Sequence, residues 1–299
     1  MSWDSEEMGN LHGFGMPVNL VAAAEREGRA DWLSRLPGVI SRLEREWAVR
    51  VGNAFQPGGH TAWVAPAGRG GDLLVVKVLW RHPEAEHEAD ALRVWDGGGA
   101  VELHGVCDVD AETIALLIER CRPGTTLQAV PEPQQDLVVA GLLRRLWRHT
   151  PAAHRFRPLK AMCDLWADEF EQKSAAGGIP LDAGLAREAI ALFRQLPLSA
   201  EREVLLCTDL HAGNVLAAER EPWLAIDPKP YVGDPAYDAL QHMLNCERLQ
   251  VDPCSLAFRM ADLLELDRDR LRLWLFARCV QESPEWPGLA EVALRLGRT

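Results

Sequence analysis

Two acidic residues and one amide in the C-terminal half have the types and spacing of a phosphoryl-transfer site. Asp209 is followed five residues later by Asn214, and Asp227 comes after a turn and an apolar run. In such sites one carboxylate accepts the proton of the attacking hydroxyl, while an amide and a second carboxylate hold Mg²⁺ on the nucleotide phosphates. The pattern predicts a small-molecule kinase with Asp209 as catalytic base and Asn214 and Asp227 as metal ligands.

Lys77 is the candidate anchor for the nucleotide phosphates. It interrupts an apolar run over 73–78 that is typical of a buried strand, where a charge requires a partner. The phosphates would satisfy Lys77 on one side and a helix glutamate on the other. Glu84 and Glu88 share a helix face, and we favour Glu88, although the choice between them stays open. The alternative is a lysine on an edge strand that faces solvent.

A short glycine-containing loop precedes that strand and offers backbone N–H groups without side-chain obstruction. Such groups suit a close approach to phosphate. The sequence matches neither G-x-G-x-x-G nor a Walker A motif, so a plain hairpin turn fits it equally well. The predicted phosphate-contacting residues are Gly58, Gly59, His60 and Thr61.

The charge of the chain bears on its acceptor. A formal net charge of −12 disfavours binding to nucleic acid or anionic membranes and favours a cationic small molecule. Asp234 also fits the cap of a following helix. His211 is expected to steady the catalytic loop by hydrogen bonding. The acidic candidates for acceptor contact are Asp234, Asp238, Glu247 and Glu282.

The N-terminal third predicts a small α+β lobe. We expect residues 1–15 to be disordered and residues 16–118 to form the lobe, with a helix at its start that breaks at Pro37-Gly38. Glycine-rich turns and alternating apolar runs then predict a mostly antiparallel sheet of five strands with one helix over 82–95. The expected strands cover 51–55, 62–66, 73–78, 100–106 and 113–118.

The remainder predicts a larger and mostly helical lobe. Loop chemistry at 119–124 marks the connector, and residues 125–299 follow. Two short apolar runs, 204–208 and 223–226, flank the Asp209 loop and are expected to pair as a hairpin beneath it. The expected helices cover 134–149, 159–174, 181–195, 237–247, 253–264 and 268–282.

Cysteine usage and hydropathy bear on the compartment. The seven cysteines are odd in number and form no C-x-x-C pair, which favours reduced thiols in the cytoplasm. No apolar run has the length of a membrane span, and the first residues lack the apolar core of a signal peptide. We expect a cytoplasmic monomer or weak dimer.

These motifs together resemble the aminoglycoside phosphotransferase branch of the protein-kinase-like fold, and within it the streptomycin 6-kinase and hydroxyurea phosphotransferase group. The resemblance runs from about residue 17 to the C-terminus, and two motifs are quite specific for the superfamily. They are Asp209-Leu-His-Ala-Gly-Asn214 and Ala225-Ile-Asp-Pro-Lys-Pro230, the latter continuing to Gly233-Asp-Pro-Ala-Tyr-Asp238.

The resemblance implies a bilobal kinase-like fold with ATP between a small antiparallel-sheet lobe and a larger helical lobe, although GTP is not excluded. It assigns Asp209, Asn214, Asp227 and Lys77 the roles given above and implies that backbone groups of Glu119 and Cys121 face adenine. The chain departs from the pattern at Cys207-Thr208, where relatives often have His-Gly. The absence of an A-P-E segment speaks against protein substrates.

Three functions follow from the sequence. The first is ATP- and Mg²⁺-dependent phosphorylation of a hydroxyl on a cationic small molecule, above all an aminoglycoside such as streptomycin, which would confer antibiotic resistance. The second keeps the fold but takes hydroxyurea, choline, a sugar amine or another metabolite as acceptor. The third is a nucleotide-binding scaffold without catalysis, which the presence of every expected chemical residue disfavours.

Overall fold

The structure of the chain is a computed structural model that describes residues 15–150, 154–175 and 181–297. Residues 1–14, which include most of the segment expected to be disordered, lie outside that description. The described chain divides into two compact units, the first extending to Arg122 apart from residues 98–100, and the second comprising 98–100 and everything from Pro123 onward. None of the described helices combines the length and apolar character needed to cross a membrane.

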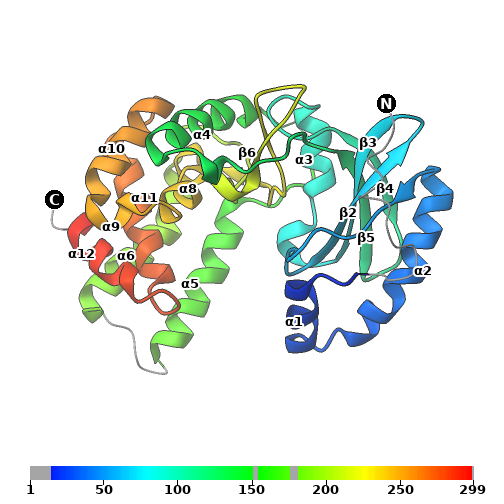
Figure 1. The fold of residues 1–299 in the computed structure, drawn as a ribbon. Helices are drawn as coiled ribbons and strands as arrows, with labels where there is room; N and C mark the ends of the chain where they lie inside the picture. The colour runs from blue at the N-terminus through cyan, green and yellow to red at the C-terminus, as the bar shows by residue number, and fades with distance from the viewer. Residues whose placement is uncertain (1–14, 151–153, 176–180, 298–299) are drawn as a thin grey trace. The chain divides into compact units, whose positions relative to one another are not determined.

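The first unit is built on a five-stranded antiparallel sheet with the strand order β1-β2-β3-β5-β4 (Figure 1). Two helices precede the sheet and a third follows strand β3. A short 3-10 turn, η1 (Pro83–Ala85), leads into that third helix. The elements are α1 (Val18–Arg26), α2 (Ala30–Trp47), β1 (Arg50–Val51), β2 (Ala62–Arg69), β3 (Asp72–Trp80), α3 (Glu88–Trp95), β4 (Leu103–Asp108) and β5 (Thr113–Glu119).

The predicted break in the N-terminal helix is wrong in its position. Helix α2 runs through Pro37, whereas the interruption comes earlier, between α1 and α2. Proline in a helix interior removes one hydrogen bond and costs about 3 kcal/mol. Burial of the apolar face of α2 compensates, because Trp32, Leu36 and Ile40 are each at most 4% exposed and join the core that covers one face of the sheet.

The second unit is mostly helical and contains two separate two-stranded sheets. The helices are α4 (Glu132–Leu146), α5 (Leu159–Ala175), α6 (Ala183–Gln195), α7 (Pro235–Asp238), α8 (Leu240–Leu244), α9 (Arg248–Val251), α10 (Pro253–Leu264), α11 (Arg268–Glu282) and α12 (Gly288–Gly297). Three short helices, α7, α8 and α9, and the 3-10 turns η2 (Leu127–Ala129) and η3 (Leu196–Ser199) connect its larger elements.

The expected hairpin between 204–208 and 223–226 does not form. Strand β6 (Val204–Leu206) pairs with β9 (Tyr231–Gly233), and β8 (Trp223–Ala225) pairs with β7 (Val215–Ala217). Each apolar run therefore has a partner that the pattern did not indicate. The chain between β6 and β7 contains Asp209 and the 3-10 turn η4 (Ala212–Asn214), and the chain between β8 and β9 contains Asp227. The loop that carries Asp209 and the loop that carries Asp227 therefore lie next to each other.

Candidate phosphoryl-transfer site

Asp209, Asn214 and Asp227 lie on two adjacent loops of the second unit. The side-chain amide of Asn214 donates from Nδ2 to the backbone oxygen of Asp209 at 3.0 Å and to its Oδ2 at 3.4 Å. This orientation turns the Asn214 Oδ1 away from Asp209. The N–H of Ile226, the residue before Asp227, donates to the backbone oxygen of Asn214 at 2.9 Å. The structure thus joins the segments of all three predicted residues through direct bonds.

One residue on each of these two loops adopts the left-handed backbone conformation, although neither residue is glycine. Thr208, directly before Asp209, has φ 51°, and Asp227 has φ 52°. Left-handed backbone at a non-glycine residue is uncommon and clusters at functional sites, where the surrounding structure enforces it. The Asp209 and Asp227 segments therefore each contain a conformation that contacts with the surrounding structure must stabilise.

Asp238 supplies much of that enforcement at Thr208. Its carboxylate accepts the backbone N–H groups of Thr208 at 2.6 Å and Cys207 at 3.1 Å, and also the indole N–H of Trp147 at 2.9 Å. The side chain is fully buried, and burial raises the pKa of Asp238 to about 6. Asp238 therefore lies against the loop that carries Asp209 and supports it, and its contact with the acceptor stays a prediction.

His211 stabilises the same loop from within, as expected. Its Nδ1 accepts the N–H of Gly213 at 3.1 Å, and burial lowers the pKa of the ring. A Cβ on Gly213 would stand 2.8 Å from His211 Cε1, so only glycine fits this turn without displacing the ring. The short turn that carries Asn214 depends on this pair.

Lys229 is the residue of this site to which sequence reasoning gives no role. Its ammonium lies 2.9 Å from Oδ2 of Asp209, the expected base. The Lys229 side chain is 31% exposed and that of Asp209 is 15% exposed, so the pair lies at the edge of solvent. The signal was present in the sequence, because Lys229 follows Asp227 by two residues within one of the two specific motifs.

In the first unit, Lys77 pairs with Glu88, the favoured one of the two glutamates. The Lys77 Nζ lies 2.7 Å from both carboxylate oxygens, and the two residues are 6% and 2% exposed. Val76 and Val78 enter the core that α1 and α2 cover, so alternation along β3 directs Lys77 to the opposite face. Glu88 begins α3, where the positive end of the helix dipole favours a carboxylate. The predicted role of this pair in nucleotide binding stays a prediction.

The glycine loop lies between β1 and β2, and Gly58 has a packing role there. It has φ 77°, and a Cβ at this position would stand 2.4 Å from the Cβ of Pro17. Asn19 of α1 donates from its side chain to the Gly58 oxygen at 2.9 Å. Gly59, in contrast, is exposed with open space around it. Contact with phosphate stays a prediction for Gly58, Gly59, His60 and Thr61, as does contact of Glu119 and Cys121 with adenine.

The remaining acceptor candidates have partners of their own. Asp234 caps α7 through the N–H of Ala236, as the capping alternative predicts. It also accepts from Arg270 at 2.7 Å and from the indole of Trp274 at 2.6 Å. Its exposure is only 3%. Contact with the acceptor remains a prediction for Asp234, which is a cap and an ion-pair partner in the structure.

Glu282 and Glu247 differ from Asp234 in their surroundings. Glu282 ends α11 and pairs with Arg278 at 2.5 Å. Glu247 is exposed, and its backbone N–H donates to Glu132. The contact of either residue with an acceptor stays a prediction.

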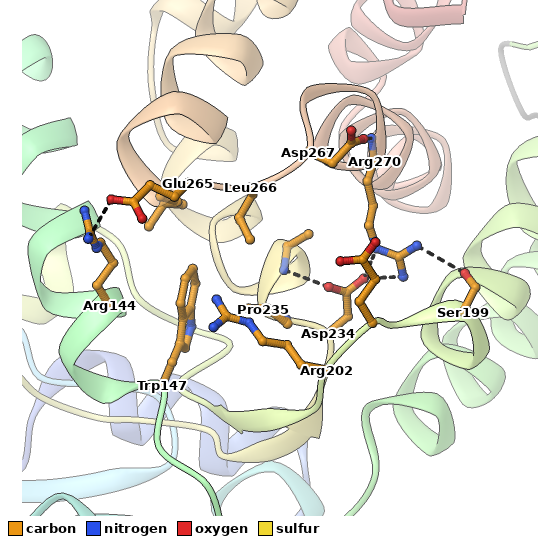
Figure 2. Close-up of a pocket in the computed structure, with 13 residues that line it drawn as sticks. Arg144, Trp147, Ser199, Arg202, Asp234, Pro235, Glu265, Leu266, Asp267 and Arg270 are labelled. Atoms are coloured by element: carbon orange, nitrogen blue, oxygen red, sulfur yellow. Dashed lines mark hydrogen bonds and ion pairs between the residues drawn. The ribbon is translucent and has the colours of Figure 1, made fainter.

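A polar pocket of about 680 Å³ lies beside Asp234, as Figure 2 shows. Its walls carry charges of both signs, and two of its arginines are already engaged, Arg144 with Glu265 and Arg270 with Asp234. The residues that line it come from α4, η3, α7, α10, α11 and the loops between them, and they include none of Asp209, Asn214 and Asp227. The pocket therefore includes one predicted acceptor residue, Asp234, but none of the three residues predicted for phosphoryl transfer.

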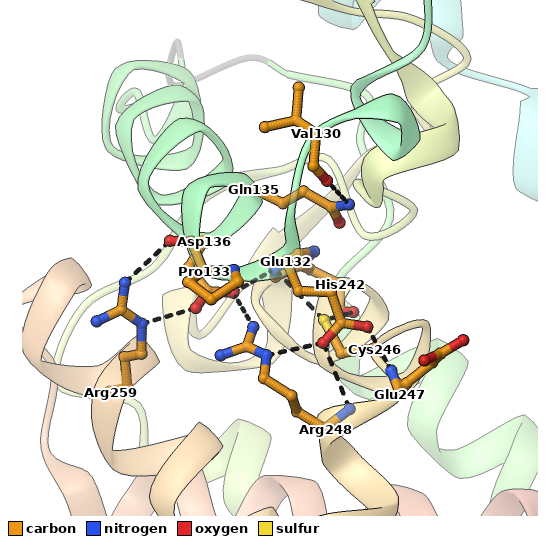
Figure 3. Close-up of polar contacts among 10 residues, drawn as sticks. All are labelled: Val130, Glu132, Pro133, Gln135, Asp136, His242, Cys246, Glu247, Arg248 and Arg259. Carbon is orange, nitrogen blue, oxygen red and sulfur yellow. Dashed lines mark hydrogen bonds and ion pairs between the residues drawn. The ribbon is translucent and has the colours of Figure 1, made fainter.

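Asp136, His242 and Cys246 form a buried group whose ligand atoms lie within 4.8 Å of one another (Figure 3). The Asp136 carboxylate, however, accepts from Arg248 and Arg259 at 2.7 Å each, as well as bonding His242 at 2.9 Å. A cation placed there would face two guanidinium groups. The arrangement does not suit a metal, and it ties α4 to α8, α9 and α10.

The hydrogen bonds to Asp136 also govern its charge. Burial alone would raise the pKa of this carboxyl, but the bonds from His242, Arg248 and Arg259 outweigh burial and hold the pKa well below its usual range. Asp136 is therefore ionised and paired in the folded protein. The seven cysteines are all free thiols, and burial raises the pKa of Cys246 to about 12, which makes it an inert packing residue.

Comparison with known proteins supplies the family context. The family model described as aminoglycoside/hydroxyurea antibiotic resistance kinase matches residues 47–287. A hydroxyurea phosphotransferase of Kitasatospora aureofaciens is 35% identical over 279 residues, covering 89% of this chain and 78% of the relative. A streptomycin 6-kinase of Streptomyces glaucescens is 34% identical over 281 residues, covering 90% and 89%.

Solved structures share the fold at much lower identity. Aminoglycoside phosphotransferase APH(4)-Ia in a ternary complex with ADP and hygromycin B aligns with a TM-score of 0.54 at 12% identity, covering 86% of this chain and 96% of that one. A choline/ethanolamine kinase family protein from Mesorhizobium loti aligns with a TM-score of 0.55 at 16% identity, covering 81% and 85%. The five-stranded antiparallel sheet followed by a mostly helical region is thus the fold that these phosphotransferases have.

Proposed function

Because this chain belongs to the aminoglycoside/hydroxyurea antibiotic resistance kinase family, we propose that it transfers the γ-phosphoryl group of ATP to a hydroxyl of streptomycin or a related aminoglycoside. Membership establishes a phosphotransferase that acts on a hydroxyl of a small molecule. We propose in addition that the phosphoryl donor is ATP, that the metal is Mg²⁺ and that the acceptor is an aminoglycoside. Cytoplasmic location and a monomeric or weakly dimeric state belong to the same proposal.

The observation that best supports phosphoryl transfer is the arrangement of residues around Asp209. Its carboxylate accepts from Asn214 and is held on a loop that Asp238 fixes from below. Asp209 would orient the acceptor hydroxyl and take its proton as the bond to phosphorus forms. Asn214 and Asp227 offer an amide oxygen and a carboxylate, a donor set of hard oxygens that fits Mg²⁺. The ion, when bound, would supply positive charge to the phosphate oxygens.

Charge supports a cationic acceptor. The formal net charge of −12 draws cations toward the protein by long-range attraction, and aminoglycosides carry several positive groups. That attraction weakens with salt because mobile ions screen it. If an aminoglycoside is the acceptor, its KM should therefore rise as the ionic strength rises.

Hydroxyurea is the second candidate acceptor, favoured by one specific observation. The hydroxyurea phosphotransferase relative is as similar to this chain as the streptomycin kinase is, at 35% against 34% identity. Hydroxyurea is small and uncharged, so its KM should be nearly independent of ionic strength. The two acceptors can thus be separated by salt as well as by turnover.

An acceptor panel tests the proposal. Purified protein is incubated with Mg²⁺ and ATP or GTP, and with streptomycin, hygromycin B, hydroxyurea or choline, while ADP or GDP release and the mass of the acceptor are followed. We expect phosphorylated streptomycin, loss of turnover with EDTA and recovery with excess Mg²⁺. Asp209→Asn serves as the inactive control. Phosphorylation of hydroxyurea alone would assign the second function, and turnover of no acceptor would reject both.

A further inference from the structure

We propose that Lys229 is a catalytic residue whose ammonium contacts the phosphoryl group during its transfer, an inference that rests on the proposed function. The Lys229 Nζ lies 2.9 Å from Oδ2 of Asp209, the proposed base. A cation at this position is adjacent to the acceptor hydroxyl that Asp209 would hold. It is therefore positioned where negative charge on the phosphoryl oxygens must be stabilised.

The backbone of Lys229 is fixed to the loop that carries Asp209. Its N–H donates to the oxygen of Cys207 at 2.9 Å, and its carbonyl accepts the hydroxyl of Thr208. Proline precedes and follows Lys229, which restricts the backbone of the segment further. The backbone of Lys229 is thus fixed relative to the Asp209 loop, so a rotation of the side chain alone can move the ammonium from Asp209 to a phosphoryl oxygen, with little reorganisation during the reaction.

Lysine is rare in this chain, and the positions of the few lysines support a special role for Lys229. Only four of the 32 Lys and Arg residues are lysine. Two of them, Lys160 and Lys173, make ion pairs, and their own side chains are 40% and 49% exposed. The other two are Lys77 and Lys229. Among the described residues, most of the other ion pairs use arginine. An ammonium differs from guanidinium in being a compact point charge with freely rotating donors.

A purely structural ion pair is the alternative to this role. Pairs that are partly exposed contribute only about 0–1 kcal/mol to stability. Replacing Lys229 should then change the free energy of unfolding little and the rate little. A cation that contacts the phosphoryl group predicts instead a large loss of rate at unchanged stability. The two roles therefore differ in a measurable way.

The proposed step conserves atoms and charge. The acceptor oxygen forms a bond to the γ-phosphorus, and the bond from that phosphorus to its bridging oxygen breaks. The bridging oxygen keeps the electron pair and leaves with ADP, while the proton of the acceptor hydroxyl passes to Asp209. Lys229 exchanges its contact with Asp209 for one with the phosphoryl oxygens, stays protonated throughout and contributes hydrogen bonds and charge.

The test compares Lys229→Met and Lys229→Arg with Lys160→Met, a matched change at an exposed ion pair in the same unit. We expect Lys229→Met to lower kcat roughly 10²- to 10³-fold, as loss of one preorganised donor does. Lys229→Arg should recover part of that loss. Lys160→Met should stay within about twofold of the wild type, a difference of less than 1 kcal/mol in the barrier. Melting temperatures of all variants show whether the fold is retained.

A binding measurement judges Lys229 without relying on turnover. Mg²⁺, ADP and aluminium fluoride imitate the phosphoryl group in transfer, and their binding is followed by thermal shift against Mg²⁺ and ADP alone. Lys229→Met should bind ADP as the wild type does but lose the additional stabilisation that fluoride provides. Wild-type behaviour of Lys229→Met in both measurements would overturn its role. Failure of every acceptor with the wild type would instead reject the proposed function, and the fluoride measurement would still decide on Lys229.

Discussion

Two lysine–carboxylate pairs, one in each unit, differ in burial and in the elements that hold them. Lys77 and Glu88 join a central strand to the start of a helix, and their side chains are 8% and 3% exposed. Lys229 and Asp209 lie on loops, at 31% and 15%. Removing one partner of a buried pair leaves an uncompensated charge and costs about 3–5 kcal/mol, whereas a partly exposed pair costs little. The comparison indicates which pair a mutation can probe without unfolding the protein.

Asp209→Ala should produce the largest effect on activity. Loss of a general base lowers kcat by roughly 10²–10⁴-fold. Stability should change by only about 1 kcal/mol or less, because the Lys229 left behind is partly exposed. Steady-state kinetics with the acceptor identified by the panel and a urea titration measure the two quantities. Near wild-type turnover would show that Asp209 is not the general base. The Lys229–Asp209 pair would then no longer differ from the Lys77–Glu88 pair in its effect on activity.

Lys77→Met should damage stability as well as activity. The unpaired Glu88 carboxylate would remain buried, so we expect a loss of about 3–5 kcal/mol in the free energy of unfolding. The double variant Lys77→Met/Glu88→Leu removes both charges and should regain most of that stability while staying inactive. Urea unfolding and ADP binding by calorimetry check this. An inactive single variant with wild-type stability would show that burial is not what distinguishes the two pairs.

Asp136→Asn extends the comparison to a third set of charges and should have a smaller, pH-dependent effect. We expect a loss of about 1–3 kcal/mol at neutral pH, because the buried carboxylate is lost, Arg259 loses its ion pair and Arg248 keeps only Glu132. The folded-state pKa of Asp136 is lowered, so its contribution is fully present above the unfolded value of 3.8 and is lost as the pH falls below it. The difference in the free energy of unfolding between variant and wild type should therefore begin to shrink near pH 4 and keep shrinking as the pH falls toward the lowered folded-state pKa. A constant difference across that range would contradict the assignment.

The candidate chemical residues could be proposed from the sequence because their spacing is a local property, while their roles stay predictions. Asp209 and Asn214 are five residues apart on one loop, and Lys77 lies within one apolar strand, so each pattern is complete within a short segment. The partner of Lys77 was favoured correctly, since the position of Glu88 in its helix is also a local property. Alternation and helical spacing likewise indicated the five-stranded lobe followed by helices.

Tertiary structure alone decided the features that depend on distant contacts. The pairing of β6 with β9 and of β7 with β8 is set by how the chain returns, which short apolar runs do not specify. Asp238 supports the loop 30 residues before it in the chain, and burial is what gives it that role. Lys229 reaches Asp209 only because two loops meet. A sequence determines which groups are available for chemistry, whereas packing determines which of them meet.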